Sequence, residues 1–238
     1  GHGTGDLLDE VVAALPEPAE EPEYPEDALR VAIIGRPNVG KSSITNRFAG
    51  KNRSIVSDVA GTTRDAIDVI VERGDKRYRL VDTAGMRKRN LVHEDVEYYS
   101  LVRGLRAIDE AEVCLLVVDA SEGVTEQDQK IAGLAIERGC ALIILLNKWD
   151  LVTDDHAREE VMQSVARRMT FAPWAPVIRV SALTGRSLEK VWAVVDRVGA
   201  AHSGQVPTSA LNNLLAQMRE SGHTIVKGPK RLRIQYAN

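Results

Sequence analysis

Residues 35–42 read GRPNVGKS, a glycine-rich run that ends in a lysine and a serine. The run fits the pattern G-x-x-x-x-G-K-[ST], in which backbone N–H groups surround the phosphates of a nucleotide. Lys41 would reach the outer phosphates, and the Ser42 hydroxyl would bind Mg²⁺. An apolar segment at 29–34 leads into the run, and a helical segment follows it, so the positive end of a helix would face the phosphates. These residues predict a nucleotide phosphate site.

A second polar motif, NKWD at 147–150, follows the apolar segment 141–146. Asp150 offers two acceptor oxygens to the N1–H and amino group of guanine, whereas adenine would meet the carboxylate with a lone pair. We expect Asn147 to bond the other side of the base and the stem of Lys148 to lie over its ring. A polar turn after a strand is the alternative for this string alone. Its position at the carboxyl end of a buried strand, together with the phosphate loop, favours a guanine site.

Three weaker motifs complete the set. Asp82, in the sequence DTAG, would hold the Mg²⁺ shell through water, and the N–H of Gly85 would meet a γ-phosphate that only glycine lets approach. GTTRD at 61–65 lies in a polar loop and supplies a threonine to Mg²⁺. VSAL at 180–183 ends a strand and offers backbone N–H groups to the guanine O6. Their order and spacing support one another.

In this order the motifs resemble the Era-like bacterial GTPases, a family that includes Era, the tRNA-modification GTPase and Der (EngA). The Der branch is most similar because residues 4–11, TGDLLDEV, repeat the pattern of residues 184–191, TGRSLEKV. Der carries two GTPase domains in tandem before a KH-like domain. The resemblance implies a fragment of such a protein: the last helix of a first GTPase domain at 1–15, a linker at 16–28, a whole GTPase domain at 29–200 and the start of a KH-like domain at 201–238.

The resemblance further implies a GTP-hydrolysing switch that acts in assembly of the large ribosomal subunit. GTP or GDP and Mg²⁺ would be its ligands, and a ribosomal subunit and rRNA would be partners of the full-length protein. Catalytic roles would fall to Lys41, Thr63, Gly85 and Asn38, and magnesium would be held by Ser42, Thr63 and Asp82. The predicted nucleotide-binding residues are Gly35, Arg36, Pro37, Asn38, Val39, Gly40, Lys41, Ser42, Ser43, Asp82, Thr83, Ala84, Gly85, Met86, Asn147, Lys148, Asp150, Ser181, Ala182 and Leu183.

The residue after DTAG is Met86, where Ras-like switches carry a glutamine that orients the attacking water. A thioether cannot hold that water, so hydrolysis needs another group or a partner. The basic run 87–89 is one candidate, although it equally suits a solvated loop or an RNA contact. Asn38 is the other candidate: the resemblance implies that it holds an activating K⁺, whereas from its type alone it could simply form a turn.

Composition and periodicity predict an α/β fold, a P-loop three-layer sandwich with a mostly parallel sheet and helices on both faces. Apolar strand segments alternate with helical ones; the strands fall at 31–34, 67–73, 78–82, 113–118, 142–146 and 177–180, and the helices near 41–49, 95–108, 125–138, 155–170 and 187–200. Residues 16–27 contain four of the nine prolines, six acids and no base, which predicts an extended acidic linker.

The remaining features are less specific. Cys114 and Cys140 lie in or beside apolar strands and are expected to be small core residues rather than a disulfide. No apolar run approaches a membrane span and no signal peptide is recognised, so we expect a cytoplasmic monomer. Residues 207–222 predict a helix capped by Thr208 or Ser209 and stopped by Gly222.

After that helix, a loop and a strand are expected over 223–238. The segment carries four basic residues, Lys227, Lys230, Arg231 and Arg233. They suit a solvated edge or, given the resemblance, an RNA contact. Whether this chain alone binds RNA is left open by the sequence.

The threonine of GTTRD that binds magnesium can be tested by substitution. We choose Thr63 over Thr62 from the family pattern and expect it to engage only when a γ-phosphate is present. Thr63→Ala should leave GDP affinity unchanged and impair GTP hydrolysis, as measured by nucleotide titration and phosphate release. Thr62→Ala is the matched control, and the reverse pair of phenotypes would show that the wrong threonine was chosen.

Overall fold

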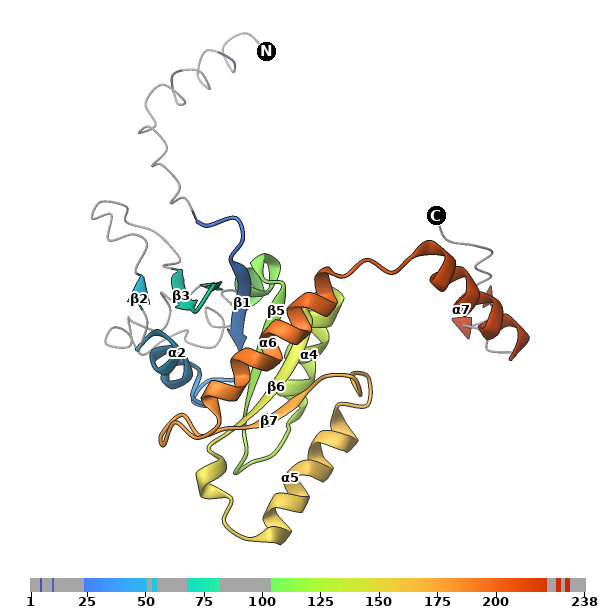
Figure 1. The fold of residues 1–238 in the computed structure, drawn as a ribbon. Coiled ribbons are helices and arrows are strands. Elements are labelled where there is room, and N and C mark those ends of the chain that lie inside the picture. The colour runs from blue at the N-terminus through green and yellow to red at the C-terminus, as the bar shows by residue number, and fades with distance from the viewer. Residues whose placement is uncertain are drawn as a thin grey trace. The chain divides into compact units, whose positions relative to one another are not determined.

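The computed structural model describes residues 24–50, 53–54, 68–81, 104–221, 226–227 and 230–231, together with Gly5 and Glu10. The chain divides into two compact units, 1–199 and 200–238. The first unit contains a seven-stranded sheet in the order β2-β3-β4-β1-β5-β6-β7 (Figure 1). Its strands are β1 (Leu29–Ile34), β2 (Arg53–Ser54), β3 (Val69–Arg73), β4 (Lys76–Val81), β5 (Val113–Asp119), β6 (Ala141–Asn147) and β7 (Val177–Arg179).

The central strands are parallel, and the edge formed by β2 and β3 is antiparallel. β4, β1, β5, β6 and β7 pair in parallel, whereas β3 runs antiparallel to both β4 and β2. The predicted fold class, an α/β sandwich with a mostly parallel sheet, is confirmed. The two-residue strand β2 was not predicted, and the expected strand at 177–180 ends one residue earlier.

Side chains of the central strands alternate between two hydrophobic cores, because both faces of the sheet are covered by helices. Ala32 of β1 and Cys114 of β5 pack on one face with the helix at 104–110, α4 (Glu126–Glu137) and α5 (Asp155–Arg168). The neighbouring residues Val31 and Val113 pack on the other face with α2 (Lys41–Ala49) and α6 (Leu188–Ser203). This two-sided burial explains the unbroken apolar runs of these strands. Both cysteines are buried and unbridged, as predicted.

The end of the predicted linker packs on the sheet rather than extending into solvent. The Tyr24 ring lies 3.8 Å from the Arg79 guanidinium, and Asp27 accepts a hydrogen bond of 2.6 Å from Arg77. Ala28 is buried. The tyrosine and the aspartate therefore give residues 24–28 fixed contacts with β4, although the stretch belongs to an acidic, proline-rich segment.

The second unit contains α7 (Thr208–Glu220) and a short antiparallel hairpin, β8 (Val226–Lys227) and β9 (Lys230–Arg231). The predicted helix is present. Its predicted cap is wrong by one residue, because the Pro207 carbonyl accepts the first intrahelical bonds, from Ala210 and Leu211. The expected loop before the final strand is itself partly a strand, since Val226 and Lys227 pair with β9.

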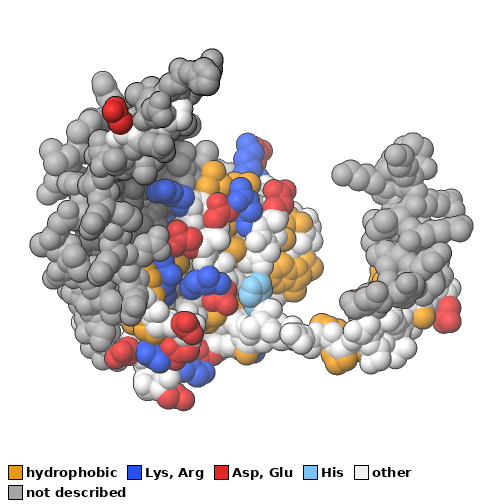
Figure 2. Space-filling view, turned by 90° about the horizontal axis from the view of Figure 1, so that it is seen from above, with side chains coloured by type: hydrophobic (Ala, Val, Ile, Leu, Met, Phe, Trp, Pro, Cys, Tyr) orange, Lys and Arg blue, Asp and Glu red, His pale blue; other side chains and the backbone are white. Residues whose placement is uncertain are grey.

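The surface of the first unit mixes the two signs of charge. Figure 2 shows acidic and basic side chains interspersed on one face of the described residues. Several form ion pairs, for example Arg30 with Glu112 at 3.3 Å. Within the described part of the chain, no helix has the length and apolarity needed to cross a membrane.

Several predictions fall on residues outside the described ranges. They concern Thr62 and Thr63, the motif and switch residues 82–86, the basic run 87–89, the first part of the helix expected at 95–108, most of the segment 1–23, Gly222 and Arg233. These predictions stay untested by the structure.

Candidate nucleotide-binding site

The phosphate loop connects the carboxyl end of β1 to the first residue of α2, Lys41. Gly35 and Gly40 both have positive φ, at 140° and 103°, and a Cβ at Gly35 would lie 2.4 Å from the Val117 carbonyl oxygen. Asn38 is also left-handed, with φ of 63°. Its backbone therefore adopts the left-handed turn conformation that asparagine tolerates better than most residues.

Asn147 joins the phosphate loop to the two loops expected to hold the base. Its Nδ2 donates to the Val39 carbonyl at 2.8 Å, and its Oδ1 accepts the Ala182 N–H at 2.9 Å. The side chain is buried, and a Cβ at Gly40 would lie 2.2 Å from Nδ2. Glycine is required at position 40 because this amide packs against the loop backbone. Both polar atoms of Asn147 are thus engaged, so the predicted direct bond to a base would have to share one of them.

Lys41 turns back onto the loop that precedes it. Its ammonium donates to the carbonyls of Gly35 at 2.7 Å and Arg36 at 2.5 Å. The cation lies at the amino end of α2, where N–H groups also point outward. Phosphate oxygens arriving there would meet one positive side chain and a row of backbone donors.

A cleft lies between this loop and the predicted base motif. It has a volume of about 430 Å³ and is lined by Asn38, Gly40, Ser42, Ser43, Arg47, Asn147, Lys148, Asp150, Leu151, Ala182 and Leu183. The volume falls in the range of small-molecule sites. Most of the predicted phosphate, magnesium and base residues among the described ones therefore border one cavity.

Asp150 carries an unmatched acceptor in that cleft. Its Oδ1 is buried and, within the described part of the chain, accepts no hydrogen bond. An unsatisfied buried acceptor costs about 1–3 kcal/mol, more for a charged group. A ligand that brings N–H donors would remove this cost, which fits the two donors of a guanine edge. Asp150 is thus the described residue whose side chain would gain most from hydrogen bonds to a ligand.

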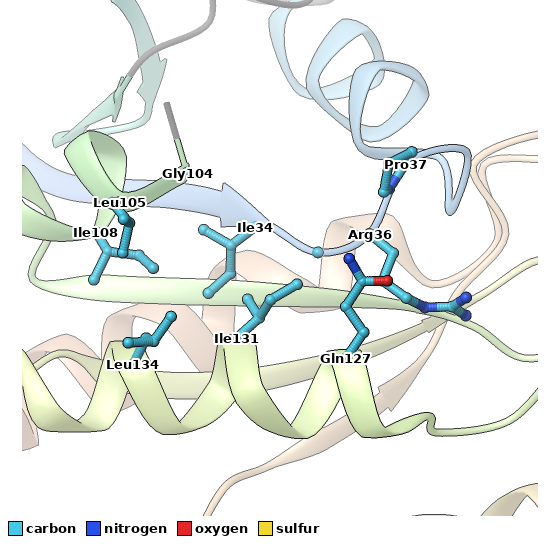
Figure 3. A pocket seen from close by; sticks show the side chains of 10 residues that line it. Ile34, Arg36, Pro37, Gly104, Leu105, Ile108, Gln127, Ile131 and Leu134 are labelled. Atoms are coloured by element: carbon cyan, nitrogen blue, oxygen red, sulfur yellow. The ribbon is translucent and has the colours of Figure 1, made fainter. Parts of the chain in front are cut away.

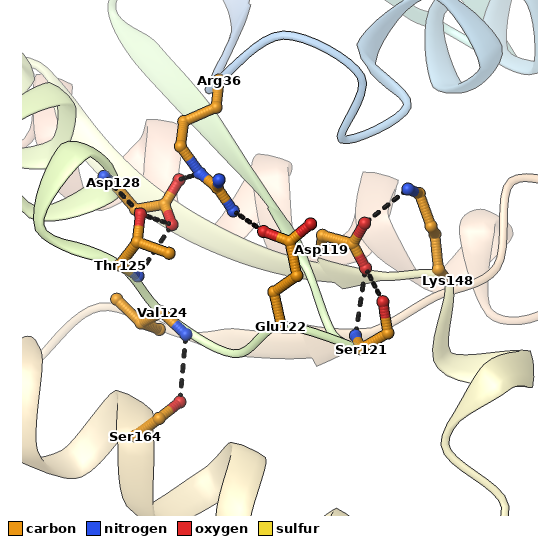
Figure 4. Close-up of polar contacts among 9 residues, drawn as sticks. All are labelled: Arg36, Asp119, Ser121, Glu122, Val124, Thr125, Asp128, Lys148 and Ser164. Carbon is orange, nitrogen blue, oxygen red and sulfur yellow. Dashed lines mark hydrogen bonds and ion pairs between the residues drawn. The ribbon is translucent and has the colours of Figure 1, made fainter.

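Lys148 forms an ion pair with a carboxylate, Asp119, that belongs to none of the predicted motifs. Its φ is 60°, and its ammonium pairs with Asp119 at the end of β5 (Figure 4). Partial burial favours the neutral acid, but hydrogen bonds from Lys148 and Ser121 outweigh burial and lower the pKa of Asp119. The carboxylate therefore stays charged at neutral pH and orients the lysine stem along the cleft. An acid ending the apolar run at 113–118 was a signal for it in the sequence.

Arg36 points away from the cleft. Its Nε donates to Asp128 at 3.1 Å and its Nη2 to Glu122 at 2.8 Å, both near the start of α4 (Figure 4). Asp128 is fully buried, and its other oxygen accepts the N–H and hydroxyl of Thr125. Arg36 was predicted among the nucleotide-binding residues of a loop that acts through its backbone N–H groups. The structure instead makes its guanidinium a clamp on the back of the phosphate loop, and only its backbone faces Lys41.

The predicted VSAL segment at 180–183 leads into a turn at 181–185 that is held by several hydrogen bonds. Ser181 is buried, and its hydroxyl accepts the Thr184 N–H at 3.1 Å. Arg47 of α2 donates to the carbonyls of Ala182, at 3.0 Å, and Leu183. The turn is thereby held by the same helix that begins at the phosphate loop. No sequence pattern singled out Arg47.

A second hollow lies on the opposite side of the phosphate loop. It has a volume of only about 50 Å³ and is lined mainly by apolar side chains, including Ile34, Leu105, Ile131 and Leu134 (Figure 3). Its polar side chains are Gln127 and Arg36, whose guanidinium is already paired. It lacks the donors and acceptors that recognise a nucleotide.

The phosphate loop, strands β1, β4, β5 and β6, and the first two residues of the base motif lie within one matched family model. The model described as 50S ribosome-binding GTPase matches residues 30–148. The chain belongs to this family. Its P-loop geometry and the buried acceptor of Asp150 agree with that assignment.

Known relatives and solved structures agree with this assignment. The chain is 46% identical over 238 residues to GTPase Der of Alkaliphilus oremlandii and 50% identical over 237 residues to GTPase Der of Heliobacterium modesticaldum. These alignments cover 100% and 99% of this chain but 54% and 53% of the relatives, so the chain spans about half their length. Era in complex with MgGDPNP and nucleotides 1506–1542 of 16S ribosomal RNA has a TM-score of 0.53 and 25% identity, covering 71% of this chain and 55% of that one.

The role of Asp150 can be tested by exchanging one acceptor for a donor. Asp150→Asn should weaken GTP binding at least tenfold, about 1.4 kcal/mol, and shift preference toward xanthosine nucleotides. Asp155→Asn, at an exposed position near the start of α5, is the control and should bind as the parent does. Calorimetric titration with GTP and xanthosine triphosphate gives both affinities. Unchanged GTP affinity in the Asp150 variant would remove this residue from base recognition.

Proposed function

We propose that this chain is the nucleotide-binding part of a GTP-hydrolysing switch protein that acts in assembly of the large ribosomal subunit. The observation that carries the proposal is the buried, unpartnered Asp150 oxygen in a cleft closed by a P-loop. Family membership and the similarity to GTPase Der support a GTPase, and the family description, 50S ribosome-binding GTPase, supports the ribosomal role. The alternative is a nucleotide-gated binding module whose own hydrolysis is negligible.

The described residues can bind and orient the nucleotide in stages. Asp150 would pair with the guanine edge, and Lys148, anchored on Asp119, would lie along the base. Lys41 would exchange its two carbonyl bonds for phosphate oxygens. Ser42 lines the cleft at the start of α2 and would bind Mg²⁺, with Thr63 and Asp82 as the further ligands implied by the resemblance. Bound Mg²⁺ neutralises phosphate charge during transfer.

No glutamine follows DTAG to orient the attacking water, so hydrolysis would need help from another group. A cation that neutralises charge on the phosphates is one such group. Asn38 lines the same cleft and lies in the loop that surrounds the phosphates, so it is placed to help hold a monovalent cation. K⁺ at that position would act on charge that develops between the β- and γ-phosphates. Met86, directly after DTAG, offers no such help.

The enzymatic proposal predicts faster GTP turnover in K⁺ than in Na⁺. Initial phosphate release in KCl and NaCl at equal ionic strength separates a specific ion from general screening. Asn38→Ala should weaken or abolish the K⁺ response without a comparable loss of GDP affinity, and Met86→Ala should do far less. Equal rates in both salts, with a large loss in the Met86 variant, would contradict the potassium role. No phosphate release in either salt, with tight GTP binding retained, would favour the binding module.

The ribosomal role requires the full-length protein. Era, a structural neighbour at 25% identity, is known in complex with MgGDPNP and nucleotides of 16S ribosomal RNA, and this similarity supports an rRNA-containing partner. Co-sedimentation of the full-length protein with isolated large and small subunits, under GDP and under a non-hydrolysable GTP analogue, tests it. We expect retention on the large subunit that depends on the nucleotide. Retention on neither subunit in either state would contradict the assembly role while leaving GTP binding intact.

A further inference from the structure

The turn at 181–185 is held from two sides by side chains that lie far from it in the sequence. Asn147 accepts the Ala182 N–H, as described, and Arg47 donates to the carbonyls of Ala182 and Leu183. Arg47 is the basic residue in the last turn of α2. Among the described residues it pairs with no carboxylate, so its charge is directed at two consecutive peptide groups. Both Ala182 and Leu183 line the cleft that contains Asp150.

The backbone donors of this turn are almost all committed. The N–H of Ser181 donates to the Arg186 carbonyl at 3.2 Å, and that of Gly185 donates to the Ser181 carbonyl at 2.8 Å. The N–H of Thr184 donates to the Ser181 hydroxyl, and that of Ala182 to Asn147. The Leu183 N–H is the remaining donor, and within the described part of the chain nothing accepts it. It is the backbone donor of this turn that is free for a ligand.

The direction of that donor follows from the bond that Arg47 makes. The Ala182 carbonyl and the Leu183 N–H belong to one peptide group, and the described chain has no cis peptide bonds. In a trans peptide the C=O and the N–H point in opposite directions. By holding the Ala182 oxygen, Arg47 points the Leu183 N–H away from α2. A charged donor on the carbonyl also polarises the peptide and strengthens its N–H as a donor.

We propose that Arg47 is a positioning residue that aims the Leu183 N–H at the O6 carbonyl of the bound guanine. This inference rests on the proposed guanine nucleotide site and adds a residue that determines its selectivity. Asp150 would read the N1–H and amino group, and Arg47, through the peptide, would read the carbonyl beside them. Arg47 reaches the two carbonyls through two different nitrogens, Nε and Nη2, whose spacing is fixed by the planar guanidinium and cannot be reproduced by the single nitrogen of a lysine.

The test compares ligands that differ in one atom or group of the base. Replacing the O6 of GDP by sulfur, in 6-thioguanosine diphosphate, weakens that acceptor and leaves the N1–H and amino group. Inosine diphosphate lacks the amino group and keeps O6. The affinity ratio of thio-GDP to GDP therefore reports on the O6 contact, and that of inosine diphosphate to GDP reports on Asp150.

We expect Arg47→Ala to weaken GDP binding several-fold. The preference for GDP over thio-GDP should fall by about the same factor. The affinity ratio of inosine diphosphate to GDP should stay at the parent value. Arg47→Lys should behave like the alanine variant, although it keeps the charge. Arg186→Ala removes a neighbouring exposed arginine whose side chain forms no hydrogen bond or ion pair with the residues that the structure describes, and should leave both ratios unchanged. Melting of the ligand-free variants checks that they fold.

The outcomes separate this inference from the proposed function. If Arg47 acts only by attracting phosphates, GDP and thio-GDP will weaken equally in the alanine variant and recover in the lysine variant, which overturns the inference. An unchanged affinity ratio of thio-GDP to GDP in the two variants also overturns the inference. If only the lysine variant folds, an unchanged ratio in that variant is enough to overturn it. If the parent protein itself fails to bind GDP, the proposed function is wrong.

Discussion

The site depends on one buried amide. Asn147 ends β6, and its two bonds tie the Val39 carbonyl of the phosphate loop to the Ala182 N–H of the turn after β7. These three segments leave different strands of the sheet, so without the amide their relative positions would follow only from strand spacing. The amide also requires that Gly40 have no side chain, since a Cβ would lie 2.2 Å from Nδ2. The loop and the turn that are predicted to bind opposite ends of a nucleotide are thereby held at one separation, which would lower the conformational entropy lost on binding.

Charged clamps on the outside of the site reinforce that arrangement. Arg36 fastens the phosphate loop to the start of α4 through a fully buried carboxylate, Asp128, and Asp119 fastens the lysine of the base motif to the end of β5. Breaking a buried pair leaves an uncompensated charge, which costs about 3–5 kcal/mol, far more than an exposed pair contributes. The first unit thus builds these ion pairs on two buried carboxylates, Asp128 at the start of α4 and Asp119 at the end of β5. Inside the cleft it leaves groups that a ligand can pair with.

The local sequence pattern predicted the strands and the positions of the motifs well. It could not predict the long-range ion pairs and hydrogen bonds that hold the loops of the site. Near-continuous apolar runs such as the one at 113–118 indicate a strand buried on both faces, and parallel strands bring their carboxyl ends together wherever they lie in the chain. By contrast, Arg36 and Asp128 are 92 residues apart, and Arg47 and Ala182 are 135 residues apart. Nothing local distinguishes these arginines from solvated ones. For the same reason Arg36, a residue inside the phosphate motif, was assigned to the nucleotide although its guanidinium points away from the cleft.

The backbone of the site is held by hydrogen bonds from Asn147 and Arg47, and two of its polar side chains, Lys41 and Asp150, can still take bonds from a ligand. Lys41 is bonded to carbonyls of its own loop, and the Asp150 Oδ1 is buried without a donor. The first contact can be exchanged for phosphate at little cost, because one set of charge-assisted bonds replaces another. The second can be satisfied only by a ligand that brings N–H groups to the carboxylate. Discrimination then follows from the penalty of leaving that carboxylate unpaired rather than from the strength of the bonds it makes, and a base that presents a lone pair at this edge incurs the penalty in full.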